Sequence, residues 1–345
     1  MVLRITDLVD ESILHILKTH HDPGDIQTKN VSESAKILIR SIGTIDILSE
    51  LQPLLKKFAV IQLLYPDIYS HRASYLWKWI QVAFEITGLN ILSNYFVVSH
   101  SLKCCSAFVT CLIDDICDTT QDENSLERGI AALSGEISDS ESYLHALIYE
   151  TWSTAQNDIR KAPNYSLLKN EFTQAYEYQI EGFRYCLTLG DYSTIDWDTY
   201  LEIVPHTIHV YLAGLIDLLY APNIRSCQLT QLKRIFLLTQ RMAQIGNWVT
   251  TWEREIDQRD YTSGVIILAI KNKWVDKDDI VKHRVDVIKR EVKRSPSERH
   301  LLHLWRESRD ESRQLSKQLD MPLIEGYIDS FSAIIFMQLA SVGLT

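Results

Sequence analysis

The sequence predicts an all-α protein, because turn residues are scarce, apolar residues follow a helical spacing and no strand hairpin pattern is visible. The 345 residues include only 12 Gly and 8 Pro, together about half the share of an average protein. Sandwiches, barrels and glycine-looped nucleotide folds need more turn residues than this. With 46% hydrophobic and 23% charged residues, the composition is that of a typical globular protein and excludes disorder over most of the chain.

Segments with helical spacing of apolar residues cover most of the sequence. Residues 77–119 are strongly apolar with one break near Gly88, which predicts two helices, the second over about residues 89–117. A helix that is apolar nearly all round is buried in the core. Residues 200–220 are also apolar and are interrupted by Pro205. Further helices are expected over residues 141–159, 165–189, 231–257, 275–319 and 323–344.

The chain is expected to form one domain over residues 1–345, because no linker or repeat divides it. Residues 20–33 are polar and contain Pro23 and Gly24. We therefore expect residues 1–33 to form a loosely packed N-terminal segment ahead of the helical domain.

The charge and the cysteines limit the classes of partner. A net charge of −10 argues against a nucleic-acid binder, which would present a basic face. An acidic protein that handles an anionic substrate needs local cations or metal ions. The six cysteines include the adjacent Cys104 and Cys105 but no Cys-x-x-Cys pair, which favours reduced core thiols over a zinc site. No apolar run reaches about 18 residues and no secretory signal is visible, so we expect a cytoplasmic protein without a membrane span.

An acidic cluster closes the apolar helix expected over residues 89–117. Asp114 and Asp118 are four residues apart and Asp115 is three from Asp118, so all three can face one site on a helix. Buried carboxylates are costly unless they bind a cation. Hard oxygen ligands suit Mg²⁺, which also takes phosphate oxygens of a substrate. The alternative is a solvated acidic helix end that runs into a polar loop.

A second polar group lies on the helix expected over residues 231–257. Asn247, Thr251 and Glu255 are spaced at four and eight residues, so they form a single stripe along a helix. An amide oxygen, a hydroxyl and a carboxylate together are a plausible oxygen set for one divalent ion. The alternative is an ordinary polar face of an amphipathic helix.

The two groups together resemble the metal-binding motifs of the class I terpene synthases. The DDxxD motif and the Asn-x3-Ser/Thr-x3-Glu motif of that family are matched by Asp114, Asp115 and Asp118 and by Asn247, Thr251 and Glu255. The order of the motifs, their separation of about 130 residues and their helical setting also fit. The resemblance covers essentially the whole chain as a single catalytic α-domain of the microbial type.

The resemblance implies a helical barrel around an apolar cavity, in which three Mg²⁺ ions, or Mn²⁺ as an alternative, hold a prenyl diphosphate. Asp114 would be the principal ligand on one side. Asp115 and Asp118 would ligate the metal or orient its waters, and the second motif would bind the third ion. Arg254 and Arg259 would bind the diphosphate.

The implied activity is cyclisation of a linear prenyl diphosphate to a terpene hydrocarbon or alcohol with release of diphosphate. Cations neutralise the leaving group, and the carbocation must be shielded from water. The small and medium residues 109–112 favour geranylgeranyl diphosphate over farnesyl diphosphate. Aromatic faces stabilise positive charge, and the cavity-lining candidates, with plain core packing as the alternative for each, are Phe84, Tyr95, Phe108, Tyr178, Phe183, Tyr211 and Trp248.

The sequence departs from the family in three places. No Arg or Lys lies between Arg184 and Arg225, where the family usually has an arginine that contacts the diphosphate. His206 or His209 would take this role if protonated, and a structural role near the Pro-containing break is the alternative. The final helix lacks the Arg-Tyr pair found in many members. Trp248 stands where an Asp often follows the asparagine, a position that is usually not a ligand.

Other functions remain as alternatives. A prenyl-elongating synthase would need a second aspartate-rich motif, which Asp257 and Asp260 do not make. A head-to-head condensing enzyme would need two DxxxD motifs. A catalytically impaired homologue or a non-enzymatic helical scaffold is the remaining class, and a homodimer is left open.

Overall fold

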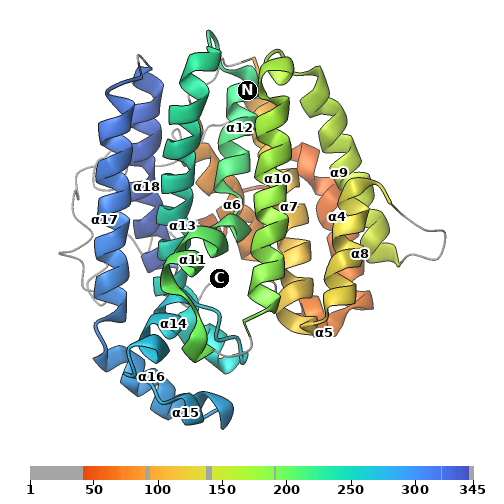
Figure 1. The fold of residues 1–345 in the computed structure, drawn as a ribbon. Coiled ribbons are helices and arrows are strands. Elements are labelled where there is room, and N and C mark those ends of the chain that lie inside the picture. The colour runs from red at the N-terminus through yellow and green to blue at the C-terminus, as the bar shows by residue number, and fades with distance from the viewer. Residues whose placement is uncertain are drawn as a thin grey trace. The chain divides into compact units, whose positions relative to one another are not determined.

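The computed structural model describes residues 42–70, 72, 74–89, 94–136, 142–189, 192–319 and 321–341, which form helices and turns without a strand (Figure 1). The prediction of an all-α protein is confirmed for this part of the chain. The N-terminal segment expected over residues 1–33 lies outside the described residues. Backbone contacts divide the chain into a first unit of Met1–Thr44, Leu189–Pro205 and Arg234–Thr345 and a second unit of Ile45–Thr188 and His206–Lys233. The single domain expected over residues 1–345 stays a prediction.

The second unit is built around α7 (Phe96–Thr120), which contacts more helices than any other element of this unit. Its neighbours are α5 (Pro66–Tyr69), α6 (Ser74–Ile86), α8 (Glu123–Ser134), α9 (Tyr143–Lys161), α10 (Tyr165–Leu187) and α12 (Val210–Tyr220), and α4 (Gln52–Leu64) packs against α5 and α9. α7 ends where Gln121 takes a left-handed φ of 48°, a common helix stop. Asp122 then accepts a 2.9 Å bond from the Ser125 amide and caps α8.

The first unit contains most of α13 (Leu229–Asp257), from Arg234 onward. Its other helices are α11 (Trp197–Ile203), α14 (Gly264–Lys271), α15 (Lys277–Val281), α16 (Val285–Arg294), α17 (Ser297–Ser316) and α18 (Pro322–Ala340), and it also holds the short 3-10 helix η3 (Tyr192–Thr194). The helical stretch expected over residues 275–319 is three helices. A left-handed φ of 48° at His283 follows the end of α15, and Pro296 cannot continue α16 because its ring blocks the ladder.

Two glycines let helices of the first unit approach closely. A Cβ at Gly246 on α13 would lie 1.8 Å from Gln338 Oε1 on α18, whose Nε2 donates to the Ala243 carbonyl at 3.1 Å. A Cβ at Gly264 would lie 2.5 Å from the Trp248 ring. These contacts fix the rotation of α13, and with it the direction in which its polar stripe points.

The sequence predicts no membrane-spanning segment, but two helices have the length and apolar composition of one. α7 and the Leu323–Ala340 part of α18 are long and apolar enough to cross a membrane by length and composition. A third span would follow if Trp197–Thr207 and Val210–Tyr220 were counted as one bent span. In each helix, 67% of the 18-residue apolar window is buried inside the protein. Packing in the protein core is therefore a second explanation for these apolar sequences, beside a membrane span.

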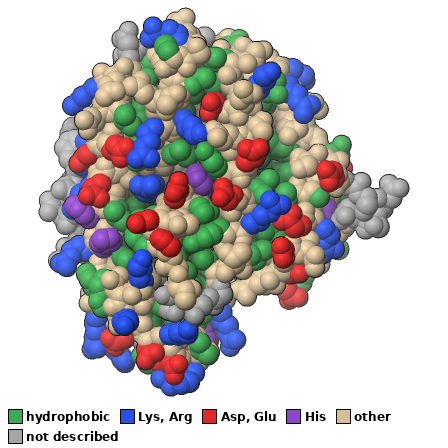
Figure 2. All heavy atoms as spheres, in the orientation of Figure 1, with side chains coloured by type: hydrophobic (Ala, Val, Ile, Leu, Met, Phe, Trp, Pro, Cys, Tyr) green, Lys and Arg blue, Asp and Glu red, His purple; other side chains and the backbone are tan. Residues whose placement is uncertain are grey.

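Charged side chains of both signs are interspersed on the face shown in Figure 2. Lys and Arg lie among Asp and Glu rather than in one basic area on this face.

A buried ion pair joins three helices of the second unit. Lys103 on α7 and Asp217 on α12 are 3% and 1% exposed, and their charged atoms lie 3.0 Å apart. Lys103 Nζ also donates to the Phe84 carbonyl at 3.1 Å. Asp217 accepts bonds from Ser99 Oγ at 2.7 Å and from the Leu89 amide at 3.0 Å. Both charges therefore have the partners that a buried ion needs.

The Lys103→Met variant should lose about 3–5 kcal/mol of unfolding free energy, because it leaves the Asp217 carboxylate buried and unpaired. Chemical denaturation followed by circular dichroism measures this loss. Lys161→Met removes an exposed lysine whose pair with Asp158 lies at 3.3 Å, and it should cost no more than about 1 kcal/mol. Equal effects of the two substitutions would contradict the role of the buried pair.

Candidate metal-binding sites

The first acidic motif lies in the last two turns of α7. Asp115 is buried, the Asp114 side chain is 37% exposed and Asp118 is exposed. Among the described residues, no group of three or more His, Cys, Asp and Glu side chains is arranged to hold a metal ion. Helical spacing alone therefore does not bring the three carboxylates to one point.

Asp115 is engaged by Arg72, from the turn between α5 and α6. Arg72 Nε donates to Asp115 Oδ1 at 2.9 Å and to Oδ2 at 2.8 Å, and Arg72 Nη2 also bonds to Oδ1. Arg72 Nη2 lies 3.9 Å from Asp114 Oδ2. Asp115, which the resemblance predicts to ligate a metal or orient its waters, is thus hydrogen-bonded to an arginine. This geometry favours a role for Asp115 in positioning Arg72 and the end of α7 over a role as a metal ligand.

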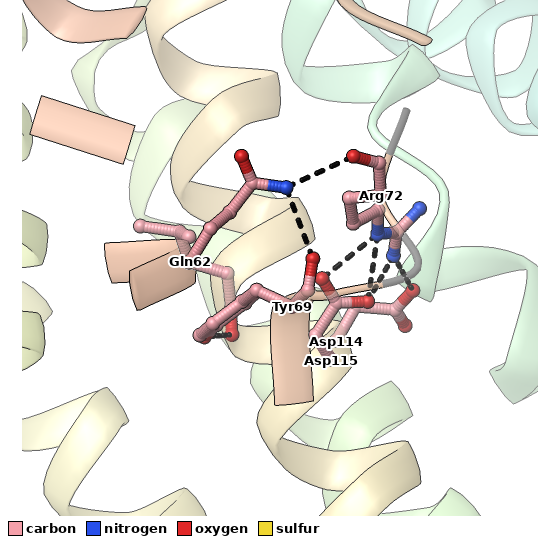
Figure 3. A network of polar contacts seen from close by, with 6 residues as sticks. Gln62, Tyr69, Arg72, Asp114 and Asp115 are labelled. Atoms are coloured by element: carbon pink, nitrogen blue, oxygen red, sulfur yellow. Dashed lines mark hydrogen bonds and ion pairs between the residues drawn. The ribbon is translucent and has the colours of Figure 1, made fainter. Parts of the chain in front are cut away.

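The arginine is itself held by a small network that Figure 3 shows. Gln62 Nε2 on α4 donates to the carbonyls of Tyr69 and Arg72 at 3.1 and 3.0 Å. The Tyr69 hydroxyl donates to the Leu112 carbonyl at 3.0 Å. Arg72 and Asp115 are 43 residues apart, so no local pattern in the sequence indicated this pair.

His209 lies next to α7, one helical turn before the acidic motif. Its Nδ1 is 3.1 Å from Thr110 Oγ1, which also accepts a 3.1 Å bond from Gln179 Nε2. Burial lowers the pKa of His209 to about 3, because the charged imidazolium is poorly solvated there. The neutral form therefore dominates at neutral pH, which argues against the expected role of His209 as a protonated diphosphate ligand.

His206 stacks on Tyr178, with ring centroids 4.7 Å apart. Lys233 Nζ donates to the Tyr178 hydroxyl at 3.2 Å and lies 5.1 Å from the ring centroid, in cation–π range. Lys233 also bonds to Gln174. The second unit therefore places a lysine beside the Tyr178–His206 stack, although no Arg or Lys lies between Arg184 and Arg225 in the sequence.

Six of the seven aromatic residues expected to line a cavity belong to the second unit. Three of these six, Phe108, Phe183 and Tyr211, are buried in the core. Phe108 packs against Phe58 and Trp77, at centroid distances of 5.6 and 5.0 Å. Among the other candidates, the ring centroids of Phe84 and His209 lie 6.2 Å apart, and those of Tyr95 and Tyr220 lie 5.2 Å apart. The Cys117 thiol donates to the Phe183 carbonyl at 3.6 Å, and the Tyr211 hydroxyl donates to Glu171 at 3.1 Å. Trp248, in the first unit, stacks on Tyr200 at 5.3 Å. The packing alternative thus has direct support at Phe108, and a role in lining a cavity stays a prediction.

The second motif lies on the last turns of α13, in the first unit. Thr251 and Glu255 are buried and Asn247 is half-buried. Thr251 Oγ1 donates to the Asn247 carbonyl at 2.7 Å, so its lone pairs remain for another partner. Trp252, whose Nε1 donates to Glu298 at 2.8 Å, anchors the other side of the same helix to α17.

Glu255 is a buried carboxyl group with an unsatisfied oxygen. The residue is 8% exposed, and its Oε2 atom has no hydrogen-bond partner among the described residues. Burial, and then the charge of Asp260, raise the pKa of Glu255 to about 8. Hydrogen bonds from the Thr251 and Ser263 side chains and the charge of Arg254 lower this pKa but do not outweigh burial. A buried polar atom without a partner needs an explanation, and a bound cation would supply one.

The turn after α13 brings Asp260 back toward Glu255. The Asp260 amide donates to the Glu255 carbonyl at 2.9 Å and the Arg259 amide donates to the Ile256 carbonyl at 3.1 Å, the bond pattern of a Schellman motif. Arg259 occupies the left-handed position with a φ of 64°. Asp260 completes no DDxxD motif in the sequence, and a left-handed arginine leaves no sequence pattern that reveals this turn.

The second motif fits a divalent cation better than the first. Its amide, hydroxyl and carboxylate supply the oxygen ligands that Mg²⁺ prefers, and Glu255 Oε2 has no protein partner in the described part of the chain. Arg254 and Arg259 are both exposed, in the last turn of α13 and in the turn that follows it. In the first motif, Asp115 is paired with Arg72, and Asp114 Oδ2 lies 3.9 Å from the same arginine.

Stability should fall with rising pH because of Glu255. Its pKa is raised from 4.5 to about 8 in the folded protein, so the folded state binds the proton more tightly and the stabilisation is lost between these values. The Glu255→Gln variant has no proton to lose at this position. Between pH 4.5 and about 8, its free energy of unfolding should therefore rise relative to that of the wild type by up to about 1.4 kcal/mol per pH unit. Urea denaturation from pH 5 to 9 with EDTA present measures the difference, and parallel pH profiles would contradict the assignment.

No protein-family model and no curated protein matches the chain.

Proposed function

We propose that the chain is a Mg²⁺-dependent class I terpene synthase, which ionises a linear prenyl diphosphate and cyclises the carbocation. The observation that carries this proposal is the Glu255 carboxyl, buried with an unpartnered Oε2 on the stripe of Asn247 and Thr251. This stripe matches the family motif residue by residue. A buried carboxylate is tolerated when it binds a cation, so the motif is supported by local chemistry as well as by spacing.

The residues of the second motif would hold one divalent ion. Asn247 offers its amide oxygen, Thr251 its hydroxyl lone pairs and Glu255 its carboxylate. The bound ion would supply the charge that makes diphosphate a good leaving group. Arg254, whose charge acts on both Glu255 and Asp260, would bind diphosphate oxygens through charge-assisted hydrogen bonds.

The first motif would act through Asp114 and Asp118, with Asp115 in a positioning role. The Arg72–Asp115 pair fixes the end of α7 and keeps an arginine within 3.9 Å of Asp114. Such a pair restrains the Asp114 carboxylate, which would lower the entropy lost when it binds a metal. Aromatic side chains on the helices of the second unit would stabilise an allylic cation if they line a cavity.

Incubation with prenyl diphosphates of 10, 15, 20 and 25 carbons and Mg²⁺ tests the proposal. We expect diphosphate release together with a cyclic hydrocarbon or alcohol, with geranylgeranyl diphosphate as the preferred substrate over farnesyl diphosphate. Mass spectrometry of extracted products and a diphosphate assay measure both. Chain-elongated products in the presence of isopentenyl diphosphate would favour an elongating synthase, and no turnover of any substrate would refute the proposal.

Variants of the two motifs complete this experiment. Asp114→Ala and Asn247→Ala should each lower kcat at least about 100-fold, because each removes a metal ligand. Asp158→Ala and Asn124→Ala are matched controls on α9 and α8, outside both motifs, and should retain activity. Full activity in either motif variant, with a folded circular dichroism spectrum, would refute the metal assignment.

A pair of glycine substitutions separates the backbone role of Arg259 from its proposed diphosphate role. Arg259 and Lys273 both hold left-handed φ angles, of 64° and 59°. Glycine removes the strain of this conformation, so Arg259→Gly and Lys273→Gly should each stabilise the fold by about 1 kcal/mol. Only Arg259→Gly should raise KM for the prenyl diphosphate, by several-fold. Equal KM values in the two variants would exclude Arg259 from substrate binding.

A further inference from the structure

We propose that Asp260 is an additional oxygen ligand of the divalent ion at Asn247, Thr251 and Glu255, so that this site contains two carboxylates. The inference deepens the proposed function, since it rests on a metal ion at the second motif. It concerns a residue five positions beyond the last motif residue, outside the helix that carries the motif.

The backbone turn brings the two acidic residues together. α13 ends at Asp257, and the left-handed Arg259 reverses the chain so that the Asp260 amide bonds to the Glu255 carbonyl at 2.9 Å. Side chains on a helix lean toward its N-terminus, so the Glu255 side chain extends back along α13 toward Thr251. The reversal places the Asp260 backbone within hydrogen-bonding distance of the Glu255 carbonyl, at the C-terminal end of the stripe.

One oxygen of Asp260 is fixed and the other is available. Oδ1 accepts bonds from the Thr262 amide at 2.8 Å and from Thr262 Oγ1 at 2.7 Å. The Thr262 carbonyl in turn accepts a bond from the Tyr200 hydroxyl on α11. These bonds hold the carboxylate plane in place, while Oδ2 forms no hydrogen bond or ion pair with the described residues. A carboxylate held through one oxygen is well placed to offer the other to a metal.

The unpartnered Glu255 oxygen is the independent observation that points to a ligand. Glu255 is more than nine-tenths buried and its Oε2 has no partner in the described residues. Placing Asp260 beside it without a cation would bring two carboxylates together in a poorly solvated environment, which is unfavourable for their charged forms. A divalent ion between Glu255 Oε2 and Asp260 Oδ2 would satisfy both oxygens and offset both charges.

Metal binding without turnover tests this inference. Mn²⁺ is titrated into the full-length protein with inorganic diphosphate present, and free Mn²⁺ is followed by electron paramagnetic resonance. Asp260→Asn keeps an oxygen that accepts from Thr262 but removes the charge, and it should raise the Kd for Mn²⁺ about tenfold or more. Asp257→Asn is the matched control, because Asp257 is paired with Lys289 at 2.7 Å on the exposed side of α13, and its Kd should equal that of the wild type.

The outcomes separate this inference from the proposed function. If Glu255→Gln weakens Mn²⁺ binding and Asp260→Asn does not, the role of Asp260 is overturned while the proposed function stands. If both variants weaken Mn²⁺ binding but the wild type consumes no prenyl diphosphate, the two-carboxylate site stands and the proposed function fails. Should Asp260→Asn not fold, Asp260→Ser, which also keeps an acceptor for Thr262, is measured in its place, and an unchanged Kd would overturn the inference.

Discussion

The requirement that a buried charge have a partner organises both units. Lys103 and Asp217 meet this requirement with each other, Asp115 with Arg72, and Asp279 with Arg284. The first two pairs join residues that are far apart in the sequence, and the third spans the turn between α15 and α16. Glu255 departs from this pattern within the described residues, because its Oε2 is buried without a donor. The exception falls within the motif for which a metal ion was expected.

The two acidic motifs are therefore not equivalent. The first lies at the end of a core helix, where one of its three carboxylates is committed to an arginine and another is exposed. The second combines a buried carboxylate with an amide and a hydroxyl on one helical stripe. A cation would gain more from the second, since a poorly solvated carboxylate attracts it more strongly than a solvated one.

Much of the fold could be predicted from the sequence, because the spacing of apolar residues within a single segment is enough to identify an amphipathic or buried helix. The segment expected over residues 231–257 corresponds to α13, and the segment expected over residues 323–344 corresponds to α18. What could not be predicted depends on contacts between distant residues. Lys103 lies inside an apolar run, and its partner Asp217 is 114 residues away. Asp260 reaches Glu255 through a left-handed turn at an arginine, a conformation for which glycine is the usual signal.

The contact between Gly246 and Gln338 also constrains how this sequence can diverge. Gln338 fills the space that a Cβ at position 246 would need, and it bonds to the backbone of α13 one turn before Asn247. A larger residue at 246 requires either that the end of the Gln338 side chain moves or that position 338 becomes smaller. The two positions are thus expected to change together among relatives of this protein, and a glycine kept at 246 would record the presence of a long side chain on the final helix.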